Sequence, residues 1–258
     1  MPERPTGEIA FVFTDIEGST RLVDALGTAA WRPLLQRHRA LVRAALAAHR
    51  GHEVGTEGDS FFVVFPDLDD AVAMVVEAQR ALAAERWPAN GVIRVRAGIH
   101  WGTGELDADG SYVGHDVHRA ARVASAAHGG QVLLSESAAD RALGALPPGV
   151  TLRSLGGHRL KDLHPERIEQ LVIEGLGADF PPIRSLDARP NNLPVQLTAF
   201  VGRERELDDL WELLVGSRLV TLTGPGGTGK SRLALQLAAS VAEQFPDGIW
   251  FVALATIT

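Results

Sequence analysis

The stretch that decides the fold is Phe13-Thr14-Asp15-Ile16-Glu17-Gly18-Ser19-Thr20. A short apolar run from Ile9 to Phe13 comes directly before its first polar residues and predicts a buried strand that ends at Asp15. A second acidic residue, Asp59, lies at the tip of a predicted hairpin, where the returning strand begins. If the two strands are neighbours in one sheet, the two carboxylates meet at one point.

Strands and helices alternate outward from this stretch. Apolar residues follow helical spacing from 22 to 49, with a turn near Gly27 and a new helix expected to open at Pro33. The pattern also predicts helices at 69–84 and 114–127, strands at 60–65, 92–99 and 131–134, and a short helix capped by Ser135. The order β-α-β-β-α-β is typical of an α/β (α+β) ferredoxin-like core, with additions at its C-terminal end.

Paired carboxylates in Gly-rich surroundings suit Mg²⁺ or Mn²⁺ bound together with phosphates. The backbone N–H groups of Ile16 to Thr20, which include Gly18 and Ser19, lead into a helix and are expected to cradle a triphosphate tail. Asp15 and Asp59 are equally typical turn residues that accept bonds from local N–H groups. The residue types alone therefore leave both interpretations open.

Several further motifs occur in a fixed order and favour the first interpretation. They are Phe13–Thr20, Gly58–Phe62, Arg96–Gly102, Gly114–Gln131 and Gly157–Leu163. Together they resemble the class III nucleotidyl cyclases over about Glu8 to Val172. The resemblance implies a cyclase domain at residues 1–175 and a phosphorus–oxygen lyase of the adenylate cyclase type.

This resemblance also implies a mechanism. Two Mg²⁺ or Mn²⁺ ions, held by Asp15, Asp59 and the backbone carbonyl of Ile16, bind the triphosphate of ATP, with GTP as a second candidate substrate. The ribose 3′-hydroxyl attacks the α-phosphate and expels pyrophosphate, while Arg122 stabilises the developing charge. In the family one chain supplies the carboxylates and its partner the arginine, so one copy predicts a head-to-tail homodimer.

Three positions depart from the family pattern, and all concern substrate recognition. By motif spacing, Gly55 replaces the purine-reading lysine, Ser111 the second purine-reading residue and His118 the ribose-orienting asparagine. Gly55 has no side chain, Ser111 offers one hydroxyl, and His118 can bond ribose or phosphate without amide geometry. Losing such bonds slows turnover roughly 10²- to 10⁴-fold.

Three interpretations of the first domain follow. It is a slow cyclase of relaxed base specificity, or a cyclase that recognises the base through other residues such as Glu57 or His52. The third is a catalytically silent domain that binds nucleotide, or only dimerises, and acts as a sensor. The retained Asp15, Asp59 and Arg122 favour an enzyme.

A second phosphate-binding motif lies near the C-terminus. Gly224-Pro225-Gly226-Gly227-Thr228-Gly229-Lys230-Ser231 matches the Walker A pattern between an expected strand at 219–223 and an expected helix at 230–242. Its backbone N–H groups are expected to wrap the phosphates of ATP, with Lys230 neutralising their charge and Ser231 binding Mg²⁺.

A proline-rich linker at 176–197 is expected to separate the two parts. After it, Phe200–Leu207 resembles the entry motif of NB-ARC-like signalling ATPases, the STAND class. The resemblance implies that 198–258 is the first part of such a domain, with a helix at 204–214, a strand at 249–253 and further domains downstream. The whole would be a signalling or transcriptional regulator.

Composition excludes several functional classes. The 258 residues contain no cysteine, so disulfides, thiolate metal sites and thiol catalysis are excluded. The net charge of −7 argues against nucleic-acid contact by this chain. The N-terminus lacks a signal peptide and no apolar run reaches membrane-spanning length, so a cytoplasmic protein without membrane contact is expected.

Overall fold

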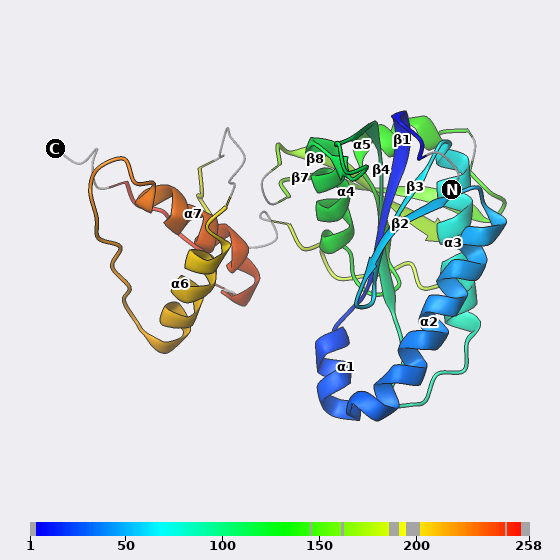
Figure 1. The fold of residues 1–258 in the computed structure, drawn as a ribbon, viewed down its shortest axis with the longest axis horizontal. Helices are drawn as coiled ribbons and strands as arrows, with labels where there is room; N and C mark the ends of the chain where they lie inside the picture. The colour runs from blue at the N-terminus through cyan, green and yellow to red at the C-terminus, as the bar shows by residue number, and fades with distance from the viewer. Residues whose placement is uncertain are drawn as a thin grey trace. The chain divides into compact units, whose positions relative to one another are not determined.

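The computed structural model describes residues 4–144, 146–160, 163–185, 191–194, 202–245 and 247–253. It divides into two compact units, drawn as a ribbon in Figure 1. The first unit contains Met1–Gly157 and Glu166–Ile183, and the second contains His158–Pro165 and Arg184–Thr258. Parts of three predicted segments lie outside the described residues, namely 161–162, 186–190 and 195–201.

The cyclase-like part alternates strands and helices as the sequence predicts. Its strands are β1 (Gly7–Ile16), β2 (His52–Glu57), β3 (Ser60–Phe65), β4 (Val95–Leu106), β5 (Tyr112–Val113), β6 (Val132–Leu134), β7 (Val150–His158) and β8 (Glu166–Ile173). Its helices are α1 (Ser19–Leu26), α2 (Thr28–Ala48), α3 (Leu68–Ala84), α4 (His115–Ala126) and α5 (Glu136–Ala142). None of the helices in the described part of the chain is both long enough and apolar enough to cross a membrane.

The strands form one sheet in the order β2-β3-β1-β4-β6-β8-β7, and β5 pairs with β4. In its first half β1 lies between β3 and β4 and is antiparallel to both. This is the strand order of a ferredoxin-like core, so the predicted fold class is confirmed. The C-terminal additions extend the same sheet, with β6 parallel to β4 and β8 antiparallel to β6.

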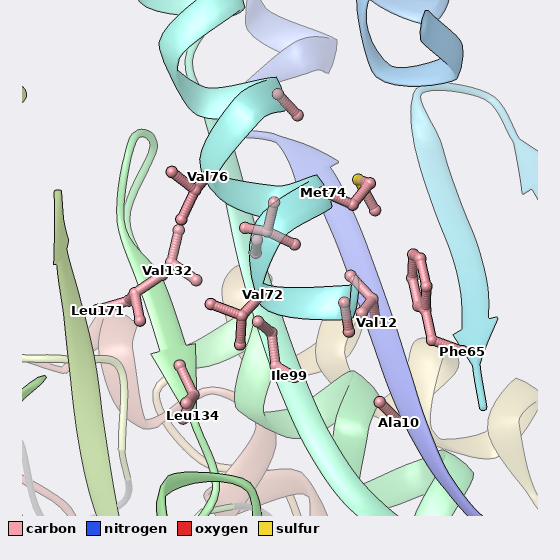
Figure 2. Close-up of a cluster of buried hydrophobic side chains, with 14 of the residues drawn as sticks. Ala10, Val12, Phe65, Val72, Met74, Val76, Ile99, Val132, Leu134 and Leu171 are labelled. Atoms are coloured by element: carbon pink, nitrogen blue, oxygen red, sulfur yellow. The ribbon is translucent and has the colours of Figure 1, made fainter. Parts of the chain in front are cut away.

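Helices cover both faces of the sheet because alternate residues of a strand point to opposite sides. Ala10 and Val12 of β1 belong to a large core with α2, α3 and α5, part of which Figure 2 shows. Ile9 and Phe11 belong to a smaller core on the side of α4. Gly98 of β4 lets α4 lie directly on the sheet, because a Cβ there would be 2.2 Å from the backbone nitrogen of Ala124.

Two local predictions of the first unit have clear outcomes. The prediction that Pro33 opens a helix is wrong, because α2 begins at Thr28 and contains Pro33. Gly27, with φ 76°, makes the turn. Trp31 and Leu34, on either side of Pro33 in the sequence, both belong to a hydrophobic cluster, and this packing offsets the loss of one backbone N–H. The predicted cap is confirmed, since the Ser135 side chain accepts a bond from the Ala138 N–H.

The second unit contains α6 (Glu204–Gly216), α7 (Lys230–Ser240) and the 3₁₀-helix η2 (Ala242–Gln244). The two predicted helices are therefore present. The predicted strands at 219–223 and 249–253 are wrong, since the described residues there show only one bridge, between Asn191 and Ile249. Leu219 is 82% exposed and Trp250 64% exposed. Apolar runs of this kind need neighbouring strands, and the described residues supply none.

Part of the predicted linker is packed rather than exposed. Ile183 is buried in the first unit, and Leu193 is buried in the second. The Asn192 side chain binds both backbone groups of Phe251, at 2.8 Å from its carbonyl oxygen and 2.6 Å from its nitrogen. These bonds hold Asn192 beside Phe251.

Candidate active site

The sheet brings Asp15 and Asp59 together. Because Thr14 of β1 pairs with Phe61 of β3, the end of β1 lies beside the β2–β3 turn that carries Asp59. The Ile16 N–H donates to Asp59 Oδ2 at 3.0 Å, and the Ser60 hydroxyl donates to Asp15 Oδ1 at 2.9 Å. Each carboxylate is thus oriented by a group from the other strand.

A cation that the sequence analysis did not single out holds Asp15. Arg96 of β4 is the register partner of Asp15, and its Nε and Nη2 atoms lie 3.0 and 2.5 Å from Asp15 Oδ2. Its other terminal nitrogen donates to the Ser125 carbonyl of α4 at 3.2 Å. Arg96 therefore ties the Asp15 carboxylate to both the sheet and α4.

Asp59 is the less compensated of the two carboxylates. Burial, followed by the negative charge of Asp15, raises the pKa of Asp59, and the bond from the Ile16 N–H opposes this rise. Two carboxylates that destabilise each other's charge suit a divalent cation. In the described parts of the chain, no group of three or more His, Cys, Asp or Glu side chains could hold a metal. Two carboxylates beside a backbone carbonyl are oxygen donors of the kind that Mg²⁺ binds together with water and phosphate.

The predicted phosphate cradle is the N-terminus of α1. Gly18 has a left-handed φ of 69° and precedes Ser19 and Thr20, the first residues of the helix, which has no side-chain cap. The first N–H groups of a helix have no intrahelical partner and favour anions. The sequence analysis missed a cation here. The Arg21 guanidinium lies close to Gly18, since a Cβ built on Gly18 would be 3.1 Å from Arg21 Nη2.

Gly55 and Ser111, the two positions that motif spacing assigns to base recognition, both have free space or solvent beside them. Gly55 lies on β2 beside a register shift, and a Cβ added there would meet no atom within 4 Å. Ser111 is exposed before β5, and its N–H donates to Asp107 Oδ1 at 2.8 Å. The two alternative base-recognition residues differ in place: Glu57 pairs with Ser60 next to the site, and His52 begins β2 at the far end.

His118 and Arg122 lie one helical turn apart on α4, so both project from the same side of the helix. His118 is exposed and Arg122 is half-buried. The Ser125 hydroxyl donates to the Arg122 carbonyl at 2.9 Å, and the Ser125 carbonyl accepts from Arg96. The helix that carries Arg122 is therefore fixed to the strand that holds Asp15.

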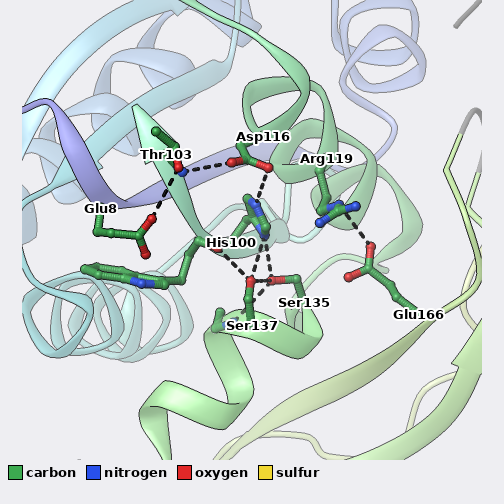
Figure 3. Close-up of polar contacts among 10 residues, drawn as sticks. Glu8, His100, Thr103, Asp116, Arg119, Ser135, Ser137 and Glu166 are labelled. Atoms are coloured by element: carbon green, nitrogen blue, oxygen red, sulfur yellow. Dashed lines mark hydrogen bonds and ion pairs between the residues drawn. The ribbon is translucent and has the colours of Figure 1, made fainter. Parts of the chain in front are cut away.

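A buried polar network fixes the other end of α4 (Figure 3). His100 of β4 places Nδ1 2.8 Å from the Ser135 hydroxyl and Nε2 3.2 Å from Asp116 Oδ1. Asp116 also accepts from the Thr103 N–H at 2.8 Å. Burial lowers the pKa of His100, and Asp116 partly opposes this shift.

Serine, histidine and aspartate in contact suggest a hydrolase, but Ser135 has no exposed surface. Its hydroxyl is used to cap α5, so no substrate can reach it. The network holds Asp116, and with it the start of α4, against β4. The helix that carries His118 and Arg122 is thereby fixed at both of its ends.

The glycine-rich loop of the second unit, Gly224–Ser231, turns into α7, and its last two residues, Lys230 and Ser231, begin that helix. Gly224, Gly227 and Gly229 have φ values of 147°, 78° and 78°, which favour glycine. The Lys230 ammonium donates to the carbonyls of Gly224 at 2.8 Å and Pro225 at 2.6 Å. Outside the loop, Arg203 donates to the Thr228 carbonyl at 3.0 Å. The expected Gly226 and Ser231 contacts to ATP and Mg²⁺ stay predictions.

Comparison with protein families agrees with the first unit's geometry. Residues 1–161 match the adenylate and guanylate cyclase catalytic domain, and residues 187–254 match an AAA domain. An uncharacterized Mycobacterium tuberculosis protein, Rv0891c, is 36% identical over 211 residues, which are 79% of this chain and 70% of that protein. An adenylate cyclase of Mycosarcoma maydis is 34% identical over 166 residues, which are 55% of this chain and only 7% of that enzyme.

The fold also matches solved cyclase structures. A Trypanosoma brucei adenylate cyclase in its monomeric state superposes with a TM-score of 0.62 and 25% identity, covering 71% of this chain and 95% of the other. The resemblance seen in the motifs is therefore confirmed over residues 1–161. The chain belongs to the family of adenylate and guanylate cyclase catalytic domains.

Proposed function

We propose that the chain is a nucleotidyl cyclase that converts ATP, with GTP as a second substrate, to a 3′,5′-cyclic nucleotide and pyrophosphate. The observation that carries the proposal is the meeting of Asp15 and Asp59, each oriented by a group from the opposite strand. Turnover is slow or of relaxed base specificity, because Gly55 and Ser111 offer little to recognise a purine.

Asp15, Asp59 and the Ile16 carbonyl would hold Mg²⁺ or Mn²⁺, which would activate the ribose hydroxyl and offset phosphate charge. Ser60 and the Ile16 N–H fix the orientation of the two carboxylates. Arg96 restrains Asp15 as a positioning residue. These bonds preorganise the acidic groups before nucleotide arrives, and the preorganisation lowers the cost of reaching the reactive geometry.

The triphosphate is proposed to lie at the start of α1. The N–H groups of Ser19 and Thr20 would bind phosphate oxygens, and Arg21 beside Gly18 would add positive charge. Arg122 would stabilise the charge that develops on the phosphorus, and His118 would bond the ribose or a phosphate. Cyclases of this family place that arginine on the partner chain, so we propose a head-to-tail homodimer.

The alternative is a silent cyclase domain that senses nucleotide, or only dimerises, and sets the state of the second unit. Gly55, Ser111 and His118 favour this alternative, because they remove the base- and ribose-orienting groups together. The second unit would then bind ATP and Mg²⁺ through Lys230 and Ser231 within a STAND-like regulator. The match of 187–254 to an AAA domain supports ATP binding there. In either case we propose a cytoplasmic signalling protein.

A cyclase assay on the full chain separates the two functions. ATP and GTP are tested separately, each with Mn²⁺ and with Mg²⁺, and Asp59→Ala serves as the blank. Cyclic product that depends on Asp59 would establish the enzyme and identify its base. A folded, dimeric protein that makes no more product than the blank would overturn the proposed activity and favour the sensor.

A further inference from the structure

A hollow of about 350 Å³ lies in the first unit, away from the two carboxylates. The end of α3, the residues that enter β4 and the segment after β8 form its walls, together with the Gly129–Gly130 turn. The described residues that line it include none of the candidate active-site residues. Its volume is at the lower end of the range of small-molecule sites.

The walls of the hollow are mostly apolar. Leu82, Ile93 and Val95 line it together with two aromatic side chains, Trp87 and Phe180. Two polar side chains of the wall already have partners, the first of them Trp87, whose indole N–H donates to the Leu82 carbonyl at 2.9 Å. The amide of Gln79 likewise donates to the Val95 carbonyl at 2.8 Å. The interior therefore suits an apolar body that needs no hydrogen bonds.

Charge gives the hollow a preference for anions. Of the described residues that line it, Arg94 is the only charged one, and its side chain is exposed. No ion pair of Arg94 is found within the described part of the chain. Glu17, whose carboxylate lies near the same Gly129 turn, has Oε1 3.6 Å from His128 Nδ1. Arg94 is therefore the one described lining residue that can offer positive charge to an anion, and the other lining side chains are mostly apolar.

We propose that this hollow binds a small organic anion with a flat apolar body and one carboxylate. The body lies with the rings of Trp87 and Phe180, and the carboxylate lies at Arg94. Inorganic phosphate and nucleotides do not fit this chemistry, because they would leave the apolar walls unoccupied or bury several charges.

The position of the hollow gives its occupant access to two important segments. The backbone carbonyl of Arg94 accepts the Glu17 N–H at 3.0 Å, at the start of the loop that follows β1. Phe180 belongs to the segment that leaves the first unit, where His128 Nε2 lies 3.0 Å from the Pro182 carbonyl. A ligand would thus contact both the support of the metal loop and the exit segment.

The test uses the full chain and two matched probes, indole-3-acetate and its neutral analogue indole-3-acetamide. The chain has five tryptophans, so the indole N–H signal of Trp87 can be assigned by its loss in Trp87→Phe. We expect both probes to shift this signal in a saturable way, with the acid bound about 2- to 5-fold more tightly. No saturable shift, or no preference for the acid, would overturn the proposal.

Three variants localise the binding. Arg94→Gln should remove the preference for the acid and leave the affinity for the amide unchanged. Arg86→Gln, a neighbouring exposed cation that does not line the hollow, should leave both affinities unchanged. Ala83→Trp, on the exposed rim, should fill the space and abolish both affinities while the melting temperature stays the same. Retained binding in a folded Ala83→Trp protein would contradict the site. None of these measurements depends on cyclase activity.

Discussion

The two predicted phosphate sites differ in what supports them. Asp15 and Asp59 are held by three strands of one sheet through bonds from Ile16, Ser60 and Arg96. The glycine-rich loop has suitable backbone angles and a helix behind it, but no strand precedes it among the described residues. Its lysine bonds the loop's own carbonyls. The backbone turn of the glycine-rich loop therefore forms without a strand before it. The positions of Asp15 and Asp59, in contrast, depend on the pairing of strands in the sheet.

The largest expected effect tests whether the two sites act independently. Asp59→Ala should reduce the formation of cyclic product by roughly 10³-fold, because it removes one of two carboxylates from the metal site. Lys230→Ala, the matched change in the glycine-rich loop, should leave the rate within about twofold, since it lies in the other unit. The measurement is cyclic nucleotide released by the full chain with Mn²⁺. Equal losses in both variants would show that the sites work as one.

Removing Arg96 tests the residue that positions Asp15 rather than the two carboxylates themselves. Arg96→Gln should lower the rate by roughly 10- to 100-fold, because groups that orient metal ligands typically have effects of this size. The expected signature is a higher Mn²⁺ concentration for half-maximal rate. Arg94→Gln, just before β4 begins, is the control and should change neither value, because no described contact joins the Arg94 side chain to Asp15. A faster Arg96→Gln enzyme would instead mean that the guanidinium competes with the cation for Asp15.

His38 links the stability of the first unit to pH. This α2 side chain has no exposed surface, stacks edge-on with Phe61, and neither ring nitrogen has a hydrogen-bond partner among the described residues. Burial, helped by Arg39 and opposed by Asp15, lowers the pKa of His38 to about 4. The unfolded chain binds the proton more readily, so stability is complete above about pH 6.5 and falls as pH drops towards 4.

Between pH 7 and pH 5 the loss of unfolding free energy from His38 should be about 2 kcal/mol. His38→Phe should remove that part of the pH dependence while the fold is kept. Urea unfolding of both proteins at the two pH values measures the difference. The same slope in His38→Phe would assign the pH dependence to other groups, such as His100.

The sequence predicts the approach of Asp15 and Asp59 better than it predicts the residues that hold them, such as Arg96. A strand end and a hairpin tip are local patterns, so the approach of Asp15 and Asp59 follows from an order of strands that the motifs indicate. The pairing of Asp15 with Arg96 depends on the register between β1 and β4, which joins residues 81 positions apart. Register is set by packing across the whole sheet and is invisible in either segment alone.

The wrong predictions have the same origin. The apolar run at 219–223 has the composition of a buried strand, but a strand forms only with a partner to share its hydrogen bonds. Pro33 looks like a helix start, yet packing of Trp31 carries the helix past it. Composition therefore predicts which elements are possible, and the surrounding structure decides which of them form.

The smallest expected effect comes from a change that adds a base-recognising side chain at Gly55. A Cβ at Gly55 meets no atom within 4 Å, so Gly55→Lys can be introduced without a clash on an exposed strand. The new ammonium would stand where the family reads the purine, and one such bond is worth roughly tenfold in rate. We expect turnover of ATP to rise relative to GTP, measured as the ratio of kcat/KM for the two nucleotides.

The control for this change is Gly55→Ala, which fills the position without adding a donor. An equal rise in both variants would mean that a stiffer β2, rather than base recognition, had improved the enzyme, since replacing glycine reduces the freedom of the strand. An unchanged nucleotide ratio in Gly55→Lys would place base recognition elsewhere. Glu57 would then be the first residue to substitute, because it pairs with Ser60 beside the two carboxylates.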